Sequence, residues 1–483
     1  MPRTSRPRFF FSDFLQLLPL HTLAQLRAGT LSGTTRLDLS ENLTVFPPEI
    51  FALADSLEIL NLSGNALAAL PADLGRLHKL RVLFCSDNKF EEVPAALGQC
   101  PALEMVGFKA NRIRTLPAAA LPPRLRWLIL TDNQLETLPA ELGACPHLQK
   151  LLLAGNRLRE LPATLANCHR LELLRVAANQ LSALPDWLLT LPRLAWLAYG
   201  GNPFYAAAEA AAEAHNPGLS IAWADLTVQQ PLGEGASGII YQARWQRAAG
   251  LPRPVALKVF KGAVTSDGRP HSEMVACLSA GPHPNLVAVY GRLQGHPAAA
   301  EGLVLKLVAP EFGNLAGPPS FASCTRDVYA PGTAFALPVV LQIAHGIASA
   351  VAHLHAQGIL HGDLYAHNIL ATTSGRSLLS DFGAASFWAS AGSAPALQRL
   401  EARAFGCLLE ELLAHGEASA PAAPPAAAQL LAALYDLQRR CQQPTVAARP
   451  LFAEIERELA ALQRAFDAAW GGFQVGVQRV EVL

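Results

Sequence analysis

An asparagine closes the frame L-x-x-L-x-L-x-x-N at regular intervals through the first part of this chain of 483 residues. Successive copies are 23 residues apart, once 22, and they end at Asn65, Asn88, Asn111, Asn133, Asn156, Asn179 and Asn202, with a degenerate first copy ending at Asn42. A period of this length is typical of solenoids, in which each repeat stacks on its neighbours. The leucines are predicted to form one continuous core, and the asparagine amides to satisfy backbone groups where each short strand turns.

Most copies continue with an apolar residue followed by proline, as at Leu70-Pro71 and Val93-Pro94. Together with the frame, this pattern resembles the leucine-rich repeat family over residues 34–205. The resemblance implies an α/β solenoid with short parallel strands along one side. Residues 1–33 are expected to cap its open end, because their leucines follow a loose helical spacing.

Alternate residues of each predicted strand face the concave side of such a solenoid. The predicted concave residues are Phe84, Met105, Trp127, Ile129, Lys150, Leu152, Leu173, Arg175 and Trp196. Solenoids commonly bind on this side, so the strip is a candidate docking site for a protein substrate or regulator, or for the rest of the chain. The competing interpretation is an ordinary repeat surface.

The composition excludes some classes of partner. Lys and Arg together number 38, as do Asp and Glu, so no excess of charge favours nucleic acid. Hydrophobic residues reach 51%, but the best candidate span, residues 334–356, contains Pro338, Gln342 and three histidines and is predicted to be a buried helix rather than a membrane span. The eight cysteines form no close pairs, which argues against a disulfide framework. A cytoplasmic location is expected.

The repeat pattern stops at Asn202, and the remaining chain divides into three segments. Residues 206–225 are predicted to be a linker that starts with the helical run A-A-A-E-A-A-A-E-A and ends its helix at N-P-G. Residues 226–470 form a second module, and residues 471–483 a C-terminal tail.

Motifs of the second module occur in a fixed order. Two alternating apolar stretches flank the turn L-G-E-G-A-S-G, and V-A-L-K follows as a further strand that ends in Lys258. A dinucleotide-binding site would need a helix directly after the glycines, and here Ile239 and Ile240 follow instead. H-G-D-L-Y-A-H-N-I-L comes next and D-F-G after it, with Asp381 18 residues beyond Asp363. This order resembles the protein kinase family, which implies an α+β fold of two lobes after the solenoid.

The resemblance also implies roles for individual residues. Lys258 would hold the ATP phosphates and pair with Glu273, while Asp363 would accept the proton of the acceptor hydroxyl. Asn368 and Asp381 would bind Mg²⁺. The expected nucleotide-binding residues are Gly233, Gly235, Gly238, Ile240, Ala256, Lys258, Lys306, Val308 and Leu370, with the backbone from Lys306 to Val308 facing the adenine.

Several positions depart from the family pattern. Gly362 replaces the arginine that usually precedes the aspartate, so activation by loop phosphorylation is not expected. Tyr365 occupies the place of a lysine in serine/threonine kinases, which leaves serine/threonine only as the default acceptor. No clear A-P-E follows D-F-G, which would leave Arg449 without its usual partner, and residues 309–337 form an unexplained long connection.

The sequence therefore predicts an ATP- and Mg²⁺-dependent protein kinase whose repeats recognise a partner or substrate. Two alternatives stay open. The first is a catalytically impaired kinase-like scaffold that acts through its repeats. The second is a small-molecule phosphotransferase of kinase fold, which the H-G-D-L-x-x-x-N-I-L form also resembles.

Overall fold

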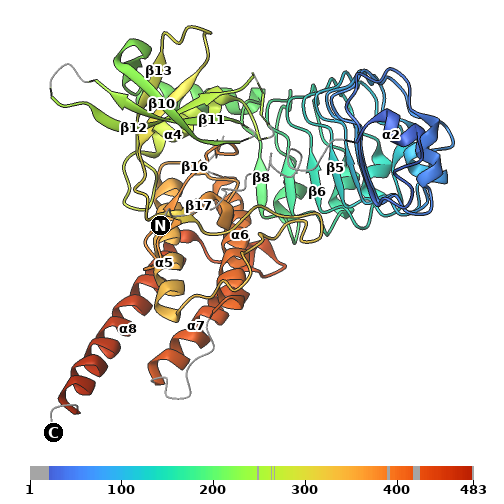
Figure 1. The fold of residues 1–483 in the computed structure, drawn as a ribbon. Helices are drawn as coiled ribbons and strands as arrows, with labels where there is room; N and C mark the ends of the chain where they lie inside the picture. The colour runs from blue at the N-terminus through green and yellow to red at the C-terminus, as the bar shows by residue number, and fades with distance from the viewer. Residues whose placement is uncertain are drawn as a thin grey trace.

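The structure is a computed structural model of the whole chain, which bends a repeat solenoid against a second domain of two lobes (Figure 1). It describes residues 21–480 apart from 236, 247–249, 263, 266, 389–391 and 417–424. The helical capping segment expected over residues 1–33 lies partly outside the described residues. Within them, helix α2 (Leu23–Arg27) starts with a capping box in which Thr22 accepts from the Gln25 amide.

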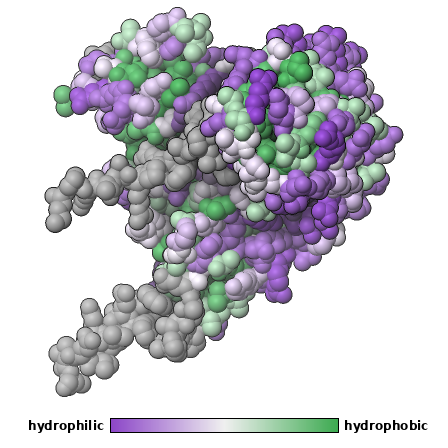
Figure 2. Space-filling model, turned by 45° about the vertical axis from the view of Figure 1, so that its right-hand side comes forward, coloured by the Kyte–Doolittle hydropathy of each residue, from purple (hydrophilic) through white to green (hydrophobic). Residues whose placement is uncertain are grey.

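The solenoid carries one sheet of eight parallel strands in chain order. The strands are β1 (Arg36–Asp38), β2 (Ile59–Asn61), β3 (Val82–Phe84), β4 (Met105–Gly107), β5 (Trp127–Ile129), β6 (Lys150–Leu152), β7 (Leu173–Arg175) and β8 (Trp196–Ala198). Single 3-10 turns return the chain on the opposite side: η1 (Pro48–Leu53), η2 (Leu74–Arg76), η3 (Ala95–Gln99), η4 (Ala118–Ala120), η5 (Ala140–Ala144), η6 (Ala163–Asn167) and η7 (Asp186–Thr190). On the face drawn in Figure 2, hydrophilic residues predominate over the solenoid, with apolar ones interspersed.

The repeated asparagines form the predicted ladder beside the leucine core. Asn156 shows the pattern: its amide group donates to the carbonyls of Leu130 and Leu153, both at 2.9 Å. Its Oδ1 accepts from the Leu135 amide at 3.0 Å. Each asparagine thus links neighbouring repeats through backbone groups that would otherwise be buried without partners. The ladder holds the strands in a fixed register up to the second domain.

The segment after the repeats is structured. Following η8 (Pro203–Tyr205), helix α3 (Ala206–His215) forms where the alanine-rich run predicts a helix. Strand β9 (Ser220–Ala222) then pairs in parallel with a strand of the next domain. Residues predicted as a linker therefore contribute a strand to the sheet of the upper lobe.

The upper lobe is a six-stranded sheet with one helix against it. The sheet has the order β10-β11-β12-β14-β13-β9. After η9 (Trp223–Asp225), the elements are β10 (Leu226–Glu234), β11 (Gly238–Trp245), β12 (Arg253–Phe260), α4 (Pro270–Ala280), β13 (Val289–Gln294) and β14 (Gly302–Lys306). Helix α4 starts with Pro270 at its first position, where the absent N–H costs nothing.

The lower lobe is helical around short strand pairs. Its elements are β15 (Gly313–Asn314), α5 (Leu337–Ala356), β16 (Ile359–Leu360), η10 (Ala366–Asn368), β17 (Ile369–Ala371), β18 (Ser377–Leu379), β19 (Ser386–Phe387), α6 (Ala394–Ala414), α7 (Pro425–Cys441), η11 (Val446–Ala448) and α8 (Phe452–Val480). Helix α5 is long and apolar enough to cross a membrane by composition, and half of its most apolar stretch is buried in this lobe. Helix α8 continues to Val480, through most of the predicted tail.

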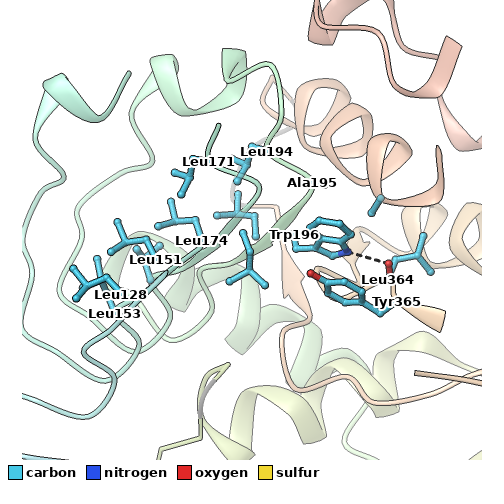
Figure 3. Packing of buried hydrophobic residues seen from close by; sticks show 14 of the residues in the cluster. Leu128, Leu151, Leu153, Leu171, Leu174, Leu194, Ala195, Trp196, Leu364 and Tyr365 are labelled. Carbon is cyan, nitrogen blue, oxygen red and sulfur yellow. Dashed lines mark hydrogen bonds between the residues drawn. The ribbon is translucent and has the colours of Figure 1, made fainter. Parts of the chain in front are cut away.

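The concave side of the solenoid faces the second domain and is largely covered by it. Trp196 of β8 stacks on Tyr365, with ring centroids 4.3 Å apart, and its indole N–H donates to the Leu364 carbonyl at 3.0 Å (Figure 3). Phe321, from the connection over residues 309–337, packs against the cluster formed by Val82, Met105 and Trp127. The sequence left two possible occupants of this strip, a separate protein or the rest of the chain. In the described structure, the rest of the chain packs on it.

Candidate active site

The first feature of the site is a buried ion pair in the upper lobe. Lys258 lies on β12 opposite Ile240 of β11, and Glu273 lies in the first turn of α4. The Lys258 ammonium donates to Glu273 Oε1, and both side chains are almost fully buried. Burial favours the neutral amine, but the charges of Glu273 and Asp381 outweigh it and raise the pKa of Lys258. Lys258 therefore stays charged at neutral pH.

The glycine turn joins β10 to β11 directly above this pair. Gly238 is explained by the sheet itself, because a Cβ there would lie 2.4 Å from the Val259 carbonyl oxygen. Gly235 is different: a Cβ there would meet nothing within 4 Å. Its backbone is also not among the described residues with positive φ. Neither packing nor backbone strain requires a glycine at 235, which fits a turn whose amides approach a phosphate group. Gly233 lies on β10 opposite Ile240.

The residues expected beside the adenine lie along two strand pairs. Ala256 of β12 is opposite Leu305 of β14, and Leu370 lies on β17. Lys306 ends β14, and its amide donates to the Ala288 carbonyl at 2.8 Å. That amide is therefore engaged within the protein. Val308 is the second residue after the strand, beyond the last ladder pair.

The loop between β16 and β17 brings Asp363 and Asn368 together. The Asn368 side-chain amide donates to Asp363 Oδ2 at 2.7 Å and to the Asp363 carbonyl at 2.9 Å. Both amide hydrogens are therefore used within the loop, which leaves Oδ1 of Asn368 as an acceptor. His361 packs inside the loop: it is fully buried, lies against Phe382, and bonds to the Ser380 carbonyl at 3.1 Å. The ring supports the loop from beneath.

Asp381 completes the constellation between the lobes. Its Oδ1 is 3.7 Å from Lys258 Nζ and accepts from the Gly383 amide at 3.2 Å. The nearby Lys258 charge lowers the pKa of Asp381, so the carboxylate is ionised. Asp381 has a φ of 56°, and its side chain is 48% exposed. An ionised carboxylate beside an amide oxygen is a donor set that suits a hard divalent cation, whose remaining ligands would be phosphate oxygens and water.

Sequence reasoning missed Glu401, which anchors the loop from α6. Its buried carboxylate accepts from the amides of Gly362 at 2.7 Å and His361 at 3.3 Å, and it bonds to His355 Nε2 at 2.7 Å. Burial alone would raise the pKa of Glu401, but these hydrogen bonds and the nearby imidazoles lower it. An acidic residue among the apolar positions of a buried helix is the only signal that the sequence contains.

Sequence reasoning also missed what Arg175 contacts, although it placed the residue on the concave side. Its guanidinium bonds to Asp363 Oδ1 through Nη2, to Asp267 Oδ1 at 2.6 Å through Nε, and to the Gly362 carbonyl at 3.0 Å through Nη1. Residue 267 precedes α4 in the upper lobe, and the other two partners belong to the lower lobe. No local pattern predicts a contact between residues 188 positions apart.

The connection over residues 309–337 has a physical explanation. It follows the concave side, where Thr325 donates to Glu172 and the Arg326 guanidinium lies over the Trp196 ring. Asp327 then turns toward the catalytic loop and bonds to His367 Nδ1 at 2.7 Å. The connection is long because it runs from the end of β14 to the concave side of the repeats and then back to the loop that carries Asp363.

Arg449 has partners other than a glutamate. Its guanidinium donates to the carbonyls of Gln443 at 2.8 Å, Arg399 at 3.2 Å and Pro192 at 2.7 Å. Pro192 belongs to the solenoid. Among the described residues Arg449 forms no ion pair with a glutamate, as the missing A-P-E predicts, and backbone oxygens, one of them from the last repeat, take the place of that carboxylate.

Comparisons with known proteins agree with both halves of the chain. Residues 226–399 match the family model described as protein tyrosine and serine/threonine kinase, and residues 123–181 match the one described as leucine rich repeat. Serine/threonine-protein kinase mos of Gallus gallus is 30% identical over 174 residues, which are 34% of this chain and 48% of that protein. Serine/threonine-protein kinase PITSLRE of Drosophila melanogaster is 29% identical over 154 residues, which are 32% of this chain and 15% of that protein. The chain thus spans less than half the length of both relatives.

Proposed function

Because this chain joins leucine-rich repeats to a protein kinase domain, we propose that it transfers the γ-phosphate of ATP to a hydroxyl group of a protein, with serine or threonine as the expected acceptor. One observation carries the proposal. Lys258, Glu273 and Asp381 form one set of contacts between the lobes, and Asp363 with Asn368 forms a second set in the loop before β17. A chain that had lost the reaction would not need to keep both sets.

The chemistry assigned to each group follows from its surroundings. Bound Mg²⁺ would offset charge on the phosphates, and Asn368 Oδ1 and the Asp381 carboxylate would hold it. Lys258, kept charged by Glu273, binds phosphate oxygens. Asp363 accepts a hydrogen bond from the acceptor hydroxyl, orients it and takes its proton. The amides near Gly235 surround the phosphates and exclude water from them.

We further propose that the repeats recognise a protein substrate or regulator and that the protein acts in the cytoplasm. Trp127 and Trp196 are buried within the same chain, Trp127 in a cluster against which Phe321 packs and Trp196 in a stack on Tyr365. A protein partner would therefore bind the solenoid elsewhere than at these two tryptophans.

A small-molecule acceptor is the second candidate, and one feature favours it. Arg175 of the solenoid bonds to Asp363, Trp196 stacks on Tyr365 two residues further along the same loop, and the Asp363 side chain is only 18% exposed. A narrow approach favours a small hydroxyl compound or a flexible peptide over the flat surface of a folded protein.

The test is transfer of labelled γ-phosphate by the full-length protein with Mg²⁺, offered generic protein acceptors and a panel of small alcohols. Asp363→Asn should lower the rate by roughly 10²- to 10⁴-fold, the usual contribution of a general base. Asp381→Ala should abolish metal-dependent transfer, and Asp186→Asn, exposed on the solenoid, is the matched control. Transfer that survives in Asp363→Asn would refute the assignment of the base, and transfer to alcohols alone would favour the second candidate.

A further inference from the structure

The position of Arg175 goes beyond what a docking surface requires. Its side chain is 2% exposed, and its three hydrogen-bond partners Asp267, Gly362 and Asp363 all lie in the kinase domain. Two of them are carboxylates, Asp267 and Asp363. A buried guanidinium that bridges two carboxylates offsets part of their combined negative charge and hydrogen-bonds to both, whereas removing it would leave the two carboxylates without this shared cation. Among the described residues, no other ion pair to Asp363 is formed.

The loop that carries Asp363 is shaped to admit β8, the strand next to the one that carries this arginine. Gly362 has a φ of +74°, and a Cβ there would lie 2.6 Å from the Leu197 carbonyl oxygen of β8 and 2.7 Å from the Ala384 carbonyl oxygen. The arginine usual at this position would not fit. Small side chains line the rest of this contact between the domains, where Ala384 packs against three alanines of the solenoid: Ala154, Ala177 and Ala198. The two domains therefore approach at backbone distance beside Asp363.

The contact is part of a permanent core rather than a surface encounter. Trp196 is 1% exposed, and Tyr199 and Tyr205 are fully buried. Tyr199 donates its hydroxyl to the Phe387 carbonyl at 3.1 Å, and the residues of the solenoid core and of the lower lobe form one hydrophobic cluster. Separating the domains would expose all of these aromatic surfaces to water, at about 25 cal/mol for each Å² of apolar area. Arg175 is thus fixed in place under ordinary conditions.

The contact also coexists with an assembled site. The Lys258 to Glu273 pair is formed while Arg175 holds both Asp363 and Asp267, which lies three residues before the start of α4. An inhibitory contact would be expected to displace one of these groups. Here the arginine instead ties the helix that carries Glu273 to the loop that carries Asp363.

We propose that Arg175 is a positioning residue of the kinase active site, contributed by the repeat domain, which orients the Asp363 carboxylate toward the acceptor and holds the two lobes in register. This inference rests on the proposed function. Its consequence is that the repeats are a structural part of the catalytic apparatus in addition to any role in recognition.

The experiment compares full-length Arg175→Met, Arg175→Lys and Arg175→Ala with the parent protein, in phosphate transfer at saturating acceptor. Arg175→Met should lower kcat by roughly 10²-fold, as expected when a catalytic group shifts by about 1 Å, while KM for ATP changes by less than about threefold. Arg175→Lys should retain an intermediate rate, because lysine keeps the positive charge but lacks the planar guanidinium that donates to several acceptors at once. Arg157→Met, exposed on the same solenoid, should match the parent.

Chemical rescue separates positioning from folding. Guanidinium ion added to Arg175→Ala, well below denaturing concentrations, should restore kcat at least about tenfold by refilling the site between the carboxylates, and equal NaCl should not. Asp267→Asn, which keeps Arg175 but removes its partner in the upper lobe, should give a smaller loss and covers the case in which the arginine variants do not fold.

Each other result would overturn the inference. A faster Arg175→Met enzyme would identify Arg175 as a block on the site, and an unchanged one would make it a bystander. Loss without guanidinium rescue, together with a lower thermal midpoint, would make its role purely structural. Absence of transfer by the parent protein with every acceptor is the distinct failure of the proposed function, and the inference would fall with it.

Discussion

Replacing Glu401 by glutamine should destabilise the protein by about 2–4 kcal/mol at pH 7 and misplace the catalytic loop. Glu401 is buried, and its two oxygens serve three groups. Oε2 accepts from His355 and from the His361 amide, and Oε1 accepts from the Gly362 amide. A glutamine has the same shape but only one acceptor oxygen. One of the two sides must therefore receive an NH₂ group.

The magnitude follows from the better of the two orientations. With the amide oxygen at the Oε2 position, the bonds from His355 and His361 are kept, and the Gly362 N–H faces a donor. A buried amide without a partner costs about 1–3 kcal/mol, and the two retained bonds lose their charge assistance, about another 1 kcal/mol. The reverse orientation leaves the His361 amide unsatisfied instead and is no better.

The assay is urea unfolding followed by tryptophan fluorescence, with Glu410→Gln as control, because Glu410 is the exposed acid on the same helix. The control should stay within about 0.5 kcal/mol of the parent. The pKa of Glu401 is lowered in the folded protein, so its contribution is present above the ordinary carboxyl range and is lost as pH falls through the folded value. Equal midpoints for Glu401→Gln and Glu410→Gln at pH 7 would refute the reasoning.

Three further substitutions test other parts of the structure. Asp327 raises the pKa of His367 against the effect of burial. Their ion pair therefore stabilises the folded protein below the ordinary histidine pKa, and this contribution is lost as pH rises through the pKa of the folded state. Thermal unfolding should show that Asp327→Asn costs more stability at pH 6 than at pH 9. Asn156→Ala removes three buried hydrogen bonds and should lower the free energy of unfolding by about 3 kcal/mol or more, whereas the exposed Asn167→Ala should not; equal urea midpoints would contradict the ladder. Trp196→Ala should cost about 3–5 kcal/mol and lower phosphate transfer as well, and a loss of stability without loss of transfer would show that the interface does not support the catalytic loop.

The sequence predicted the parts of this fold that repeat or that follow a motif. Each asparagine of the ladder bonds within its own repeat and to the one before, so its role can be read from a spacing of 23 residues. Lys258 and Glu273 are likewise close along the chain and lie on elements whose order is fixed. The geometry of Asp363 with Asn368 depends on a single short loop. Such local relations leave a pattern in the sequence.

The contacts between the two modules leave no such pattern. Arg175 fits the repeat frame as well as any concave residue, and only the docking of β7 against the catalytic loop gives it Asp363 as a partner. In the sequence, Gly362 indicates only that an arginine is missing, although in the structure it is the residue that lets β8 approach the loop that carries Asp363. For Arg449 the sequence indicates only that its usual partner is missing, and the Pro192 carbonyl that it binds instead lies in the other module. Each of these depends on an orientation between domains that periodicity cannot encode.

The seam between β8 and the catalytic loop restricts how this protein can grow. Adding a 23-residue copy beyond β1 would lengthen the solenoid at its distant end and leave every contact of Arg175 unchanged. The same copy inserted between β7 and β8 would move Arg175 one strand further from Asp363, about 4.8 Å, which is more than a hydrogen bond can span. Lineages of this protein should therefore differ in repeat number at the N-terminal end and keep the last two repeats constant. A count of repeats in related sequences would show whether repeat number varies only at the end of the solenoid that lies far from the active site.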